Sequence, residues 1–582
     1  MAQPVLRALS MNDSHLAVIF CGLTIHLMFN KLEHTTPLRY LLVVSGILPL
    51  VPCYIFSASP ASLSLETSYL VTYMTLIVSV LCYRLSPLHP LWKYPGPILG
   101  RCSKFYGIWQ QHSGEMYLKV QAMHDCYGDV VRTGPNELTI RNISALQPIL
   151  GIDGMAKGPL WDGRRAPNST TRSVITIRET RVHLERRKPW NRALASTSIR
   201  GYEPLLKTRL MQLIDALSKP DPDQRTAIPS WKKIDLSHWI SLFSYDFMGD
   251  MAFGGLGYEL MRDGDVFGLW DLMDRGIRVQ CYTQHIPWAN TLQSYIPGAG
   301  AAAVRMRQFV GGAAQTRLKR GMGPLGIDLS SYLLDELNPS PKPMPPQLYA
   351  GEAFLAVVAG SDTTATAICS AFAYMLHDKK YFYKLREEID SNFPWDDEKR
   401  PVDDTSTLAH LPMLNGIINE SLRLLPPVPH GLQRAPDANK GGKMVGDIFV
   451  PEHTAITVSP YTMHRDPRYF SPLPEKFVPE RWIKNAPESS NSQSIGDSEY
   501  DGVDFVTNPS AFIPYSLGPM NCVGRPLAQM ELRVVVATIV QELDLELDMG
   551  WDAARWERDI KDHFVFTKGK LPVRVSRRGA AQ

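Results

Sequence analysis

The sequence predicts a mainly α-helical fold with a small β portion, preceded by N-terminal transmembrane helices. Three uncharged apolar runs lie within the first 85 residues. After residue 100 the apolar residues recur mostly with helical spacing, and the longest such stretch runs from Gln347 to His377. Segment 128–140, GDVVRTGPNELTI, instead indicates two short strands around the Gly134-Pro135 turn. We therefore expect a membrane anchor (1–85), a hinge (86–100) and one large folded domain (101–582).

Composition argues against several classes of function. The 61 Lys and Arg residues nearly balance the 58 Asp and Glu residues, so a nucleic-acid-binding surface over the whole chain is not expected. The cysteines form no C-x-x-C pair and no dense cluster, which disfavours a zinc site or a disulfide framework and suits a reducing compartment. They are Cys21, Cys53, Cys82, Cys102, Cys126, Cys281, Cys369 and Cys522.

The apolar runs at 16–30, 40–56 and 68–83 predict up to three membrane spans, although each is shorter than the roughly 20 residues that a spanning helix needs. Lys31 and Arg39 flank the loop after the first run, and further cations follow Arg84. The positive-inside rule then places this loop and everything after residue 84 on the cytoplasmic side. A single span or a re-entrant hairpin is the alternative, because prolines interrupt the second run. A transporter is excluded because the polar bulk of the chain follows the runs.

Segment 86–100, SPLHPLWKYPGPILG, contains four prolines. Proline fixes the backbone and removes an amide donor, so this composition predicts a stiff, non-helical linker between the anchor and the large domain.

Cys522 is the centre of the most informative stretch, Ala511 to Leu532. An apolar-periodic run after it predicts a helix that begins just past the sulfur, where helix N–H groups should lower the thiol pKa. Gly518 and Gly524 would let the backbone pass close to a flat cofactor. Haem iron held by one Cys thiolate is the arrangement associated with O–O bond cleavage. A buried core cysteine is the alternative.

This stretch resembles the haem-binding loop of the cytochrome P-450 family, Phe-x-x-Gly-x-Arg-x-Cys-x-Gly. Tyr515, Gly518, Cys522 and Gly524 are in register with it. The resemblance implies a haem cofactor with Cys522 as the axial thiolate ligand of the metal. Tyr515 replaces the usual Phe, and Met520 replaces an Arg that normally contacts a haem propionate, so the propionates must be anchored elsewhere.

The middle of the long helix, Ala359-Gly-Ser-Asp-Thr-Thr364, is polar between apolar flanks. A Thr hydroxyl there can bond back to the carbonyl four residues earlier and open the turn. An ordinary helix irregularity is the alternative. The segment resembles the family's oxygen-activation signature, Ala/Gly-Gly-x-Asp/Glu-Thr, which implies that Asp362 and Thr363 are catalytic and deliver protons during oxygen activation.

Glu420 and Arg423 stand three residues apart on one predicted helix face, among apolar neighbours that should partly bury the pair. They resemble the family's Glu-x-x-Arg element, whose third member would be Arg481 in FVPERW. The resemblance implies that these three residues hold the scaffold behind the cysteine. With the other motifs, it covers the chain from about residue 90 to the C-terminus.

A basic helix is predicted to start at His183. In the resemblance, His183 and Arg187 fall where the family's Trp-x-x-x-Arg contacts propionates, and Arg434 is assigned to the cofactor as well. The remaining assignments are two sets of residues. The cationic face for docking a reductase is Arg186, Lys188 and Arg192, and the candidate substrate contacts are Trp161, Tyr282 and Trp288.

The resemblance therefore implies a haem-thiolate monooxygenase that oxidises a small apolar substrate with O₂ and electrons from an NADPH-dependent flavoprotein reductase. We expect it in the endoplasmic reticulum membrane, with the catalytic domain (101–582) in the cytoplasm. It resembles fungal microsomal members, which often serve secondary metabolism or xenobiotic oxidation. A haem-thiolate isomerase or dehydratase and a non-catalytic haem sensor are the alternatives. Segment 486–502 is predicted to be a polar surface insertion.

Overall fold

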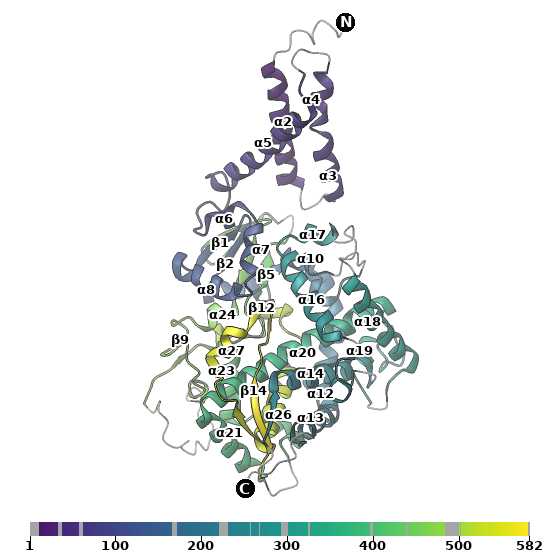
Figure 1. Ribbon diagram of the computed structural model, residues 1–582, viewed down its shortest axis with the longest axis vertical. Helices are drawn as coiled ribbons and strands as arrows, with labels where there is room; N and C mark the ends of the chain where they lie inside the picture. Colours follow the sequence, from purple (N-terminus) through teal and green to yellow (C-terminus); the bar gives the residue numbers. More distant parts are fainter. Residues whose placement is uncertain are drawn as a thin grey trace. The chain divides into compact units, whose positions relative to one another are not determined.

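The computed structural model describes residues 11–32, 38–57, 62–165, 171–219, 231–255, 258–266, 268–292, 301–323, 326–395, 400–437, 440–483, 500 and 502–579. The chain divides into two compact units, which Figure 1 shows with the sequence in colour. The smaller unit comprises Met1–Tyr106 with Arg132–Asn136, and the larger comprises Gly107–Val131 with Glu137–Gln582. Most of the predicted insertion at 486–502 lies outside the described residues.

The smaller unit is built on two long helices, α2 (Met11–Leu32) and α5 (Leu65–Leu85). Ser64 caps α5 by accepting a hydrogen bond from the amide of Thr67. The helices pack closely at Gly22, where an added Cβ would lie 2.7 Å from the carbonyl oxygen of Thr72. His26 Nδ1 lies 2.6 Å from the hydroxyl of Ser79, which adds a polar contact to the pair.

The second apolar run does not form the single spanning helix that the sequence predicts. It forms α3 (Leu38–Ile47) and α4 (Leu50–Ile55), which are separated by a turn at Leu48-Pro49. Among the N-terminal residues that the structure describes, α5 alone is long and apolar enough to cross a membrane by length and composition. The prediction of which side each loop faces depends on residues that include 33–37, which lie outside the described part.

Between α5 and α6 (Ile98–Cys102) the Pro-rich segment forms turns and bends and is packed within its unit. Its last three residues, 98–100, which the sequence predicts to be non-helical, belong to α6. The Arg132 amide donates to the carbonyl of Pro95 at 2.7 Å. Gly96 has φ +155°, and a Cβ there would lie 2.2 Å from the carbonyl oxygen of Arg132. This close approach explains why glycine occupies the position.

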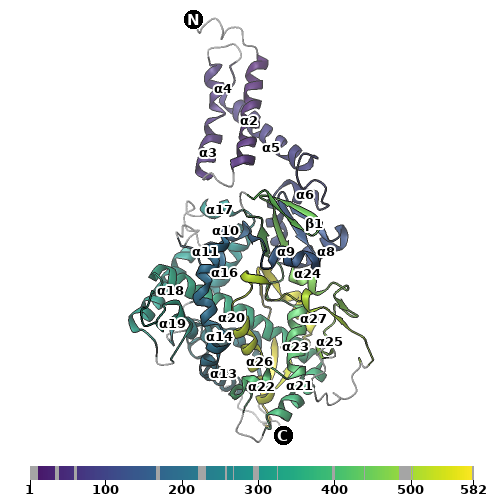
Figure 2. The same ribbon diagram turned by 180° about the vertical axis from the view of Figure 1, so that it is seen from behind.

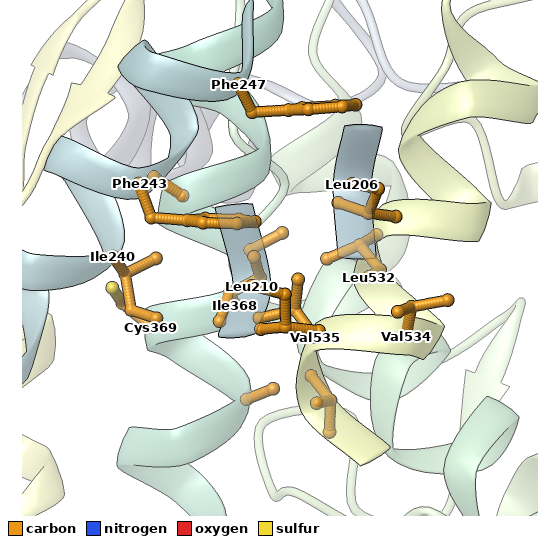
Figure 3. Packing of buried hydrophobic residues seen from close by; sticks show 14 of the residues in the cluster. Leu206, Leu210, Ile240, Phe243, Phe247, Ile368, Cys369, Leu532, Val534 and Val535 are labelled. Atoms are coloured by element: carbon orange, nitrogen blue, oxygen red, sulfur yellow. The ribbon is translucent and has the colours of Figure 1, made fainter. Parts of the chain in front are cut away.

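The larger unit is mostly helical around α20 (Pro346–His377), which begins with a proline in its first turn. The helix packs along α14 (Leu236–Phe253) and also contacts α23 (Pro412–Leu424) and α26 (Arg525–Glu542), as Figure 2 shows. Figure 3 shows Phe243, Ile368 and Val535 meeting in the core between α14, α20 and α26. Burial of these apolar side chains holds α20 through the centre of the unit.

The other α-helices have the following bounds: α7 (Phe105–Gln111), α8 (Met116–Tyr127), α9 (Leu146–Leu150), α10 (Leu160–Gly163), α11 (Thr180–Ala193), α12 (Ser196–Ile199), α13 (Glu203–Ser218), α15 (Leu260–Asp263), α16 (Leu269–Thr283), α17 (Pro287–Leu292), α18 (Ala301–Arg320), α19 (Leu329–Leu333), α21 (Lys379–Asn392), α22 (Thr405–Leu408), α24 (Pro460–His464), α25 (Glu480–Ile483) and α27 (Ala553–Asp559).

The β portion is small, as predicted. The two strands expected around the Gly134-Pro135 turn are β1 (Val130–Gly134) and β2 (Glu137–Ile140). In one sheet, β2, β8 (Ala455–Val458), β5 (Leu432–Ala435) and β3 (Ala156–Lys157) are adjacent in that order. A second sheet has the order β11-β14-β4, formed by β11 (Leu543–Leu547), β14 (Pro572–Arg577) and β4 (Lys232–Asp235). The remaining strands pair two by two: β6 (Gly442–Val445) with β7 (Ile448–Pro451), β9 (Phe470–Ser471) with β10 (Val506–Thr507), and β12 (Lys561–His563) with β13 (Val565–Thr567).

Candidate functional site

Cys522 lies between a short 3₁₀ turn (Gly518–Met520) and the start of α26. Its amide donates to the carbonyl of Tyr515 at 2.9 Å, which closes the loop around the sulfur. Burial raises the pKa of the Cys522 thiol, although the amides of Gly524 and Arg525 and the charge of Arg187 act in the lowering direction. The predicted lowering of the thiol pKa is therefore wrong, because desolvation outweighs the helix N-terminus.

The Cys522 side chain is nevertheless exposed to solvent. A sulfur that is both surrounded by protein and reachable faces an opening within the fold. Gly524 keeps this opening wide, since the nearest atom to a Cβ added there would be the Cys522 sulfur at 3.8 Å. At Gly518 the structure shows a further reason for glycine. It has φ +68°, and a Cβ there would lie 2.2 Å from the carbonyl oxygen of Leu150, so it is needed for packing against α9.

Tyr515 packs its ring in the same loop, 5.8 Å from the guanidinium of Arg525, and burial raises the pKa of its hydroxyl. Met520 is partly exposed at the end of the 3₁₀ turn. The loop therefore presents an aromatic ring and a thioether where the family pattern has an aromatic ring and an arginine.

Cationic side chains gather in the buried region between β3, β5 and α11. Lys157 Nζ lies 3.3 Å from His183 Nδ1 and also donates to the carbonyls of Val174 and Ile175. Arg434 is buried opposite Lys157 in the register of the β3–β5 pair. Burial and the charges of Arg434 and Arg187 hold the pKa of Lys157 well below its ordinary value. Burial and Lys157 lower the pKa of His183 to about 3, which keeps its ring neutral.

The cationic cluster (Lys157, Arg187 and Arg434), with the neutral ring of His183 beside it, is poorly balanced by acids. The one carboxylate whose charge acts on Lys157 is that of Glu352, and both of its oxygens already accept from the amide of Val174. Buried His183 Nε2 has no hydrogen-bond partner among the described residues. Because buried cations without a counter-charge are costly, the cluster fits a group that carries carboxylates. The propionates of a haem are such a group.

Lys157 is the member of this cluster that sequence reasoning missed. It lies in a poorly periodic segment, and β3 contains only two residues. The signal that could have found it is the strand pairing that places Lys157 across from Arg434. That pairing joins residues 277 positions apart, so the local pattern does not contain it.

Arg187 connects α11 to the cysteine loop. Its Nη1 donates to the carbonyl of Asn521 at 2.5 Å, and its Nη2 donates to the Asn521 side chain at 2.6 Å. Its Nε donates to Asn191 on the same helix. Arg187 therefore holds Asn521, the residue immediately before Cys522. The sequence predicts only a propionate contact for Arg187 and does not predict this contact with the cysteine loop.

The predicted polar centre of α20 lies on a continuous helix. Thr363 Oγ1 donates to the carbonyl of Ala359 at 2.7 Å, which is the back-bond expected from the sequence. Ala359 is exposed although most of the helix around it is buried, so this face of α20 also borders an opening. Gly360 faces α14, where an added Cβ would lie 2.7 Å from Met248, and glycine thus permits the close packing of the two helices.

Asp362 has partners on two other elements. Its Oδ2 accepts from the hydroxyl of Tyr245 on α14 at 2.9 Å, and its Oδ1 lies 3.4 Å from Lys568 Nζ. A cavity of about 350 Å³ is lined by these three residues and by side chains that include His238 and Arg278. Asp362 is therefore positioned where this cavity meets the helix, and its carboxylate contacts Tyr245 and Lys568 rather than Thr363.

Glu420, Arg423 and Arg481 meet in a fully buried network. Arg423 donates to both Glu420 oxygens at 2.8 Å, and Arg481 Nε donates to Oε1 at 2.9 Å. Trp482 Nε1 donates to Oε2 at 2.9 Å. Although burial opposes ionisation, the two guanidinium groups hold the pKa of Glu420 below its ordinary value. Trp482, which the sequence reading did not assign to the network, completes it.

The predicted substrate contacts lie on the neighbouring helices α10, α16 and α17, but they differ in exposure. Trp161 is buried against Phe564, with ring centroids 5.6 Å apart, whereas Trp288 is exposed on α17. Tyr282 is half-buried, with its hydroxyl 3.5 Å from His112.

The predicted docking cations are also partly neutralised by neighbouring acids. Arg186 points inward, 3.6 Å from Glu352, and Arg192 pairs with Asp335. Lys188 is exposed and pairs with Glu185 at 2.8 Å.

Comparison with known proteins gives matches over most of the chain. The family described as Cytochrome P450 matches residues 95–571. The chain is 31% identical to Cytochrome P450 67 from Uromyces fabae over 84% of its own length and 86% of that protein. It is 29% identical to Tryprostatin B 6-hydroxylase from Aspergillus fumigatus over 96% of its own length and 95% of that protein. On the strength of the matched range and of the site geometry, the chain belongs to the cytochrome P450 family.

Proposed function

We propose that the protein is a membrane-bound haem-thiolate monooxygenase with Cys522 as the axial ligand. The family implies a haem-thiolate cofactor and a monooxygenase that uses a redox partner and an organic substrate. The observation that carries the assignment of Cys522 is its position, surrounded by protein yet reachable, at the start of α26 and beside the open side of Gly524. When bound, haem supplies the redox centre at which O₂ is reduced and cleaved.

The cationic cluster would hold the haem propionates. Lys157 and Arg434 offer buried charge-assisted donors for these carboxylates. Arg187 would act mainly on the cysteine loop through Asn521, with a smaller direct share in binding propionate. This arrangement accounts for Met520, because cations from β3 and β5 can take the place of the arginine that the loop lacks.

Asp362 and Thr363 would supply protons during oxygen activation. The cavity of about 350 Å³ gives Asp362 access to solvent, and Tyr245 and Lys568 fix the orientation of its two oxygens. Thr363 lies one position further along α20, with its hydroxyl on the side of the exposed Ala359. A proton taken up at Asp362 would thus enter from the cavity side and leave toward the Thr363 side of the helix.

The relatives support the class of reaction. One of them is named a hydroxylase of tryprostatin B, and another is the Cytochrome P450 monooxygenase phqL of Penicillium fellutanum. We propose hydroxylation or another oxidation of a mostly apolar organic molecule, in fungal secondary metabolism or xenobiotic oxidation. An NADPH-dependent flavoprotein reductase would donate electrons, and α5 would anchor the protein in the endoplasmic reticulum membrane with its large unit in the cytoplasm.

The test uses the full chain, loaded with haem and combined with a flavoprotein reductase. NADPH consumption that depends on both a bound organic molecule and the reductase, together with an oxygenated product, is the expected result. A protein that binds haem but never consumes NADPH would instead support a haem sensor. Conversion of an oxygenated substrate without O₂ or NADPH would support an isomerase or dehydratase.

A further inference from the structure

Arg164 is a cation held in a fixed place by neutral partners. It follows α10, whose last residue, Gly163, packs so tightly on α16 that an added Cβ would lie 2.2 Å from the carbonyl oxygen of Thr283. The guanidinium carbon lies 3.9 Å from the ring centroid of Phe564. Nη1 donates to Gln284 Oε1 at 3.0 Å. The thiol of Cys281 is a further side-chain hydrogen-bond partner. These contacts orient the guanidinium, which has more N–H donors than the two partners use.

No carboxylate forms a salt bridge with Arg164 among the described residues. Asp562 is the acid whose charge acts on it, but the Asp562 oxygens lie 2.9 Å from the amide of Phe564 and 2.6 Å from His430 Nδ1. Cys281, the other neighbour, is fully buried, and burial raises the pKa of its thiol to about 12, so it stays uncharged. The buried Nε2 of Gln284 also has no acceptor in the part of the chain that the structure describes.

The place of Arg164 links it to the candidate site. Phe564, on which it stacks, also packs edge-on against Trp161, and Lys157 Nζ lies 5.3 Å from the centroid of the Trp161 ring. The chain after Phe564 runs along α20, where Thr366 donates to the carbonyl of Phe566 at 3.3 Å. The packed rings of Phe564 and Trp161 thus connect Arg164 to Lys157 of the cationic cluster. The segment that follows Phe564 also reaches the part of α20 that carries Asp362.

We propose that Arg164 and Gln284 bind a carboxylate on the substrate, so that the preferred substrates have an apolar body and an acidic end. This rests on the proposed function and narrows its substrate class. A planar guanidinium with an adjacent amide donor matches the two oxygens of a carboxylate. Phe564, on which the guanidinium stacks, and Trp161, which packs against Phe564, are the apolar side chains next to it. A phosphate is disfavoured because a dianion would call for a second cation at this point.

The test compares ligands that differ only in the acidic end. Dodecanoate is compared with 1-dodecanol, and 4-phenylbutyrate with 4-phenylbutan-1-ol, in calorimetric titrations of the haem-loaded full chain. The wild type is expected to bind at least one acid ten or more times tighter than its alcohol. Arg164→Gln should abolish this preference while changing the affinity for the alcohol less than twofold. Arg165→Gln, which removes the same charge from the adjacent residue, should retain the preference.

Two results would overturn the assignment. One is a wild type that shows no preference for the acid in either pair, and the other is an Arg164→Gln protein that keeps the preference. The spectrum of the reduced CO complex, recorded on the same preparations, separates this failure from that of the proposed function. If the spectrum is of the thiolate type but no acid is preferred, only the proposed carboxylate site is refuted. If the spectrum has no thiolate character, the haem-thiolate assignment itself is refuted.

Discussion

Arg187 on α11 holds both the carbonyl and the side-chain oxygen of Asn521, at 2.5 Å and 2.6 Å. The two residues are 334 positions apart, and Asn521 immediately precedes Cys522. A planar guanidinium that makes two such bonds fixes the loop in orientation as well as in position. Arg187 is therefore a positioning residue for the cysteine.

Replacing Arg187 should loosen the cysteine loop. We expect Arg187→Ala to release haem to excess apomyoglobin several times faster than the wild type. Arg187→Lys keeps the charge but cannot make the two-pronged contact, so it should restore only part of the retention. If the lysine variant retained haem as well as the wild type, charge alone would explain the effect, and the contact with Asn521 would be incidental.

Cys522 is tested by a change of one atom. Cys522→Ser removes the thiolate that would set the electronics of the iron. The reduced CO complex of the variant should lose the long-wavelength Soret band typical of thiolate ligation. Cys102→Ser, which changes a partly exposed cysteine in the smaller unit, is the matched control and should keep the band. Retention of the band in the Cys522 variant would exclude this residue as the ligand.

If Lys157 binds a haem propionate, replacing it should speed haem loss, whereas replacing an exposed lysine should not. Lys157→Met keeps most of the length of the side chain but removes a buried donor of the cationic cluster, so haem should be lost faster. Lys188→Met, at an exposed position, should have no effect on haem loss. Met520→Arg should tighten retention, because it returns a cation to the loop. Identical loss rates in all four proteins would refute this account of propionate binding.

The lowered pKa of Glu420 predicts how the free energy of unfolding depends on pH. Because Arg423 and Arg481 lower the pKa of its buried carboxyl, its contribution is fully present above the ordinary value of 4.5 and is lost as the pH falls through the folded-state pKa. Glu420→Gln leaves two buried guanidinium groups without their counter-charge and should cost about 3–5 kcal/mol near neutral pH. Urea unfolding should show the difference from the wild type shrinking in acid.

A matched control for Glu420 is the exposed ion pair of Glu185 and Lys188. Glu185→Gln should change the free energy of unfolding by less than about 1 kcal/mol at any pH, because exposed pairs are weak. A difference between wild type and Glu420→Gln that stayed constant down to strongly acidic pH would argue against an ionised Glu420 in the folded protein.

Local patterns predicted those parts of the fold and site that depend on neighbouring residues. The spacing of Glu420 and Arg423 places both on one helix face, and the polar Asp362 and Thr363 stand out within an apolar helix. Lys157 could not be found this way, because its role depends on the pairing of β3 with β5. The pKa of Cys522 was predicted in the wrong direction, since desolvation in the folded protein is invisible in the sequence.

Replacing Thr363 tests the proposed proton relay directly. Thr363→Ala removes the hydroxyl that now bonds to the carbonyl of Ala359, but leaves Cys522 and the cationic cluster untouched. Haem binding and reduction should therefore survive. Loss of a positioned proton donor should lower the rate of product formation by about 10²- to 10⁴-fold, while NADPH is still consumed and hydrogen peroxide is released. The measurement is product and peroxide formed per NADPH, once a turnover substrate is known.

Thr363→Ser keeps a hydroxyl at the same place and should restore much of the coupling. An alanine variant with wild-type coupling would mean that Thr363 serves only the helix, and it would return the isomerase and sensor functions to consideration.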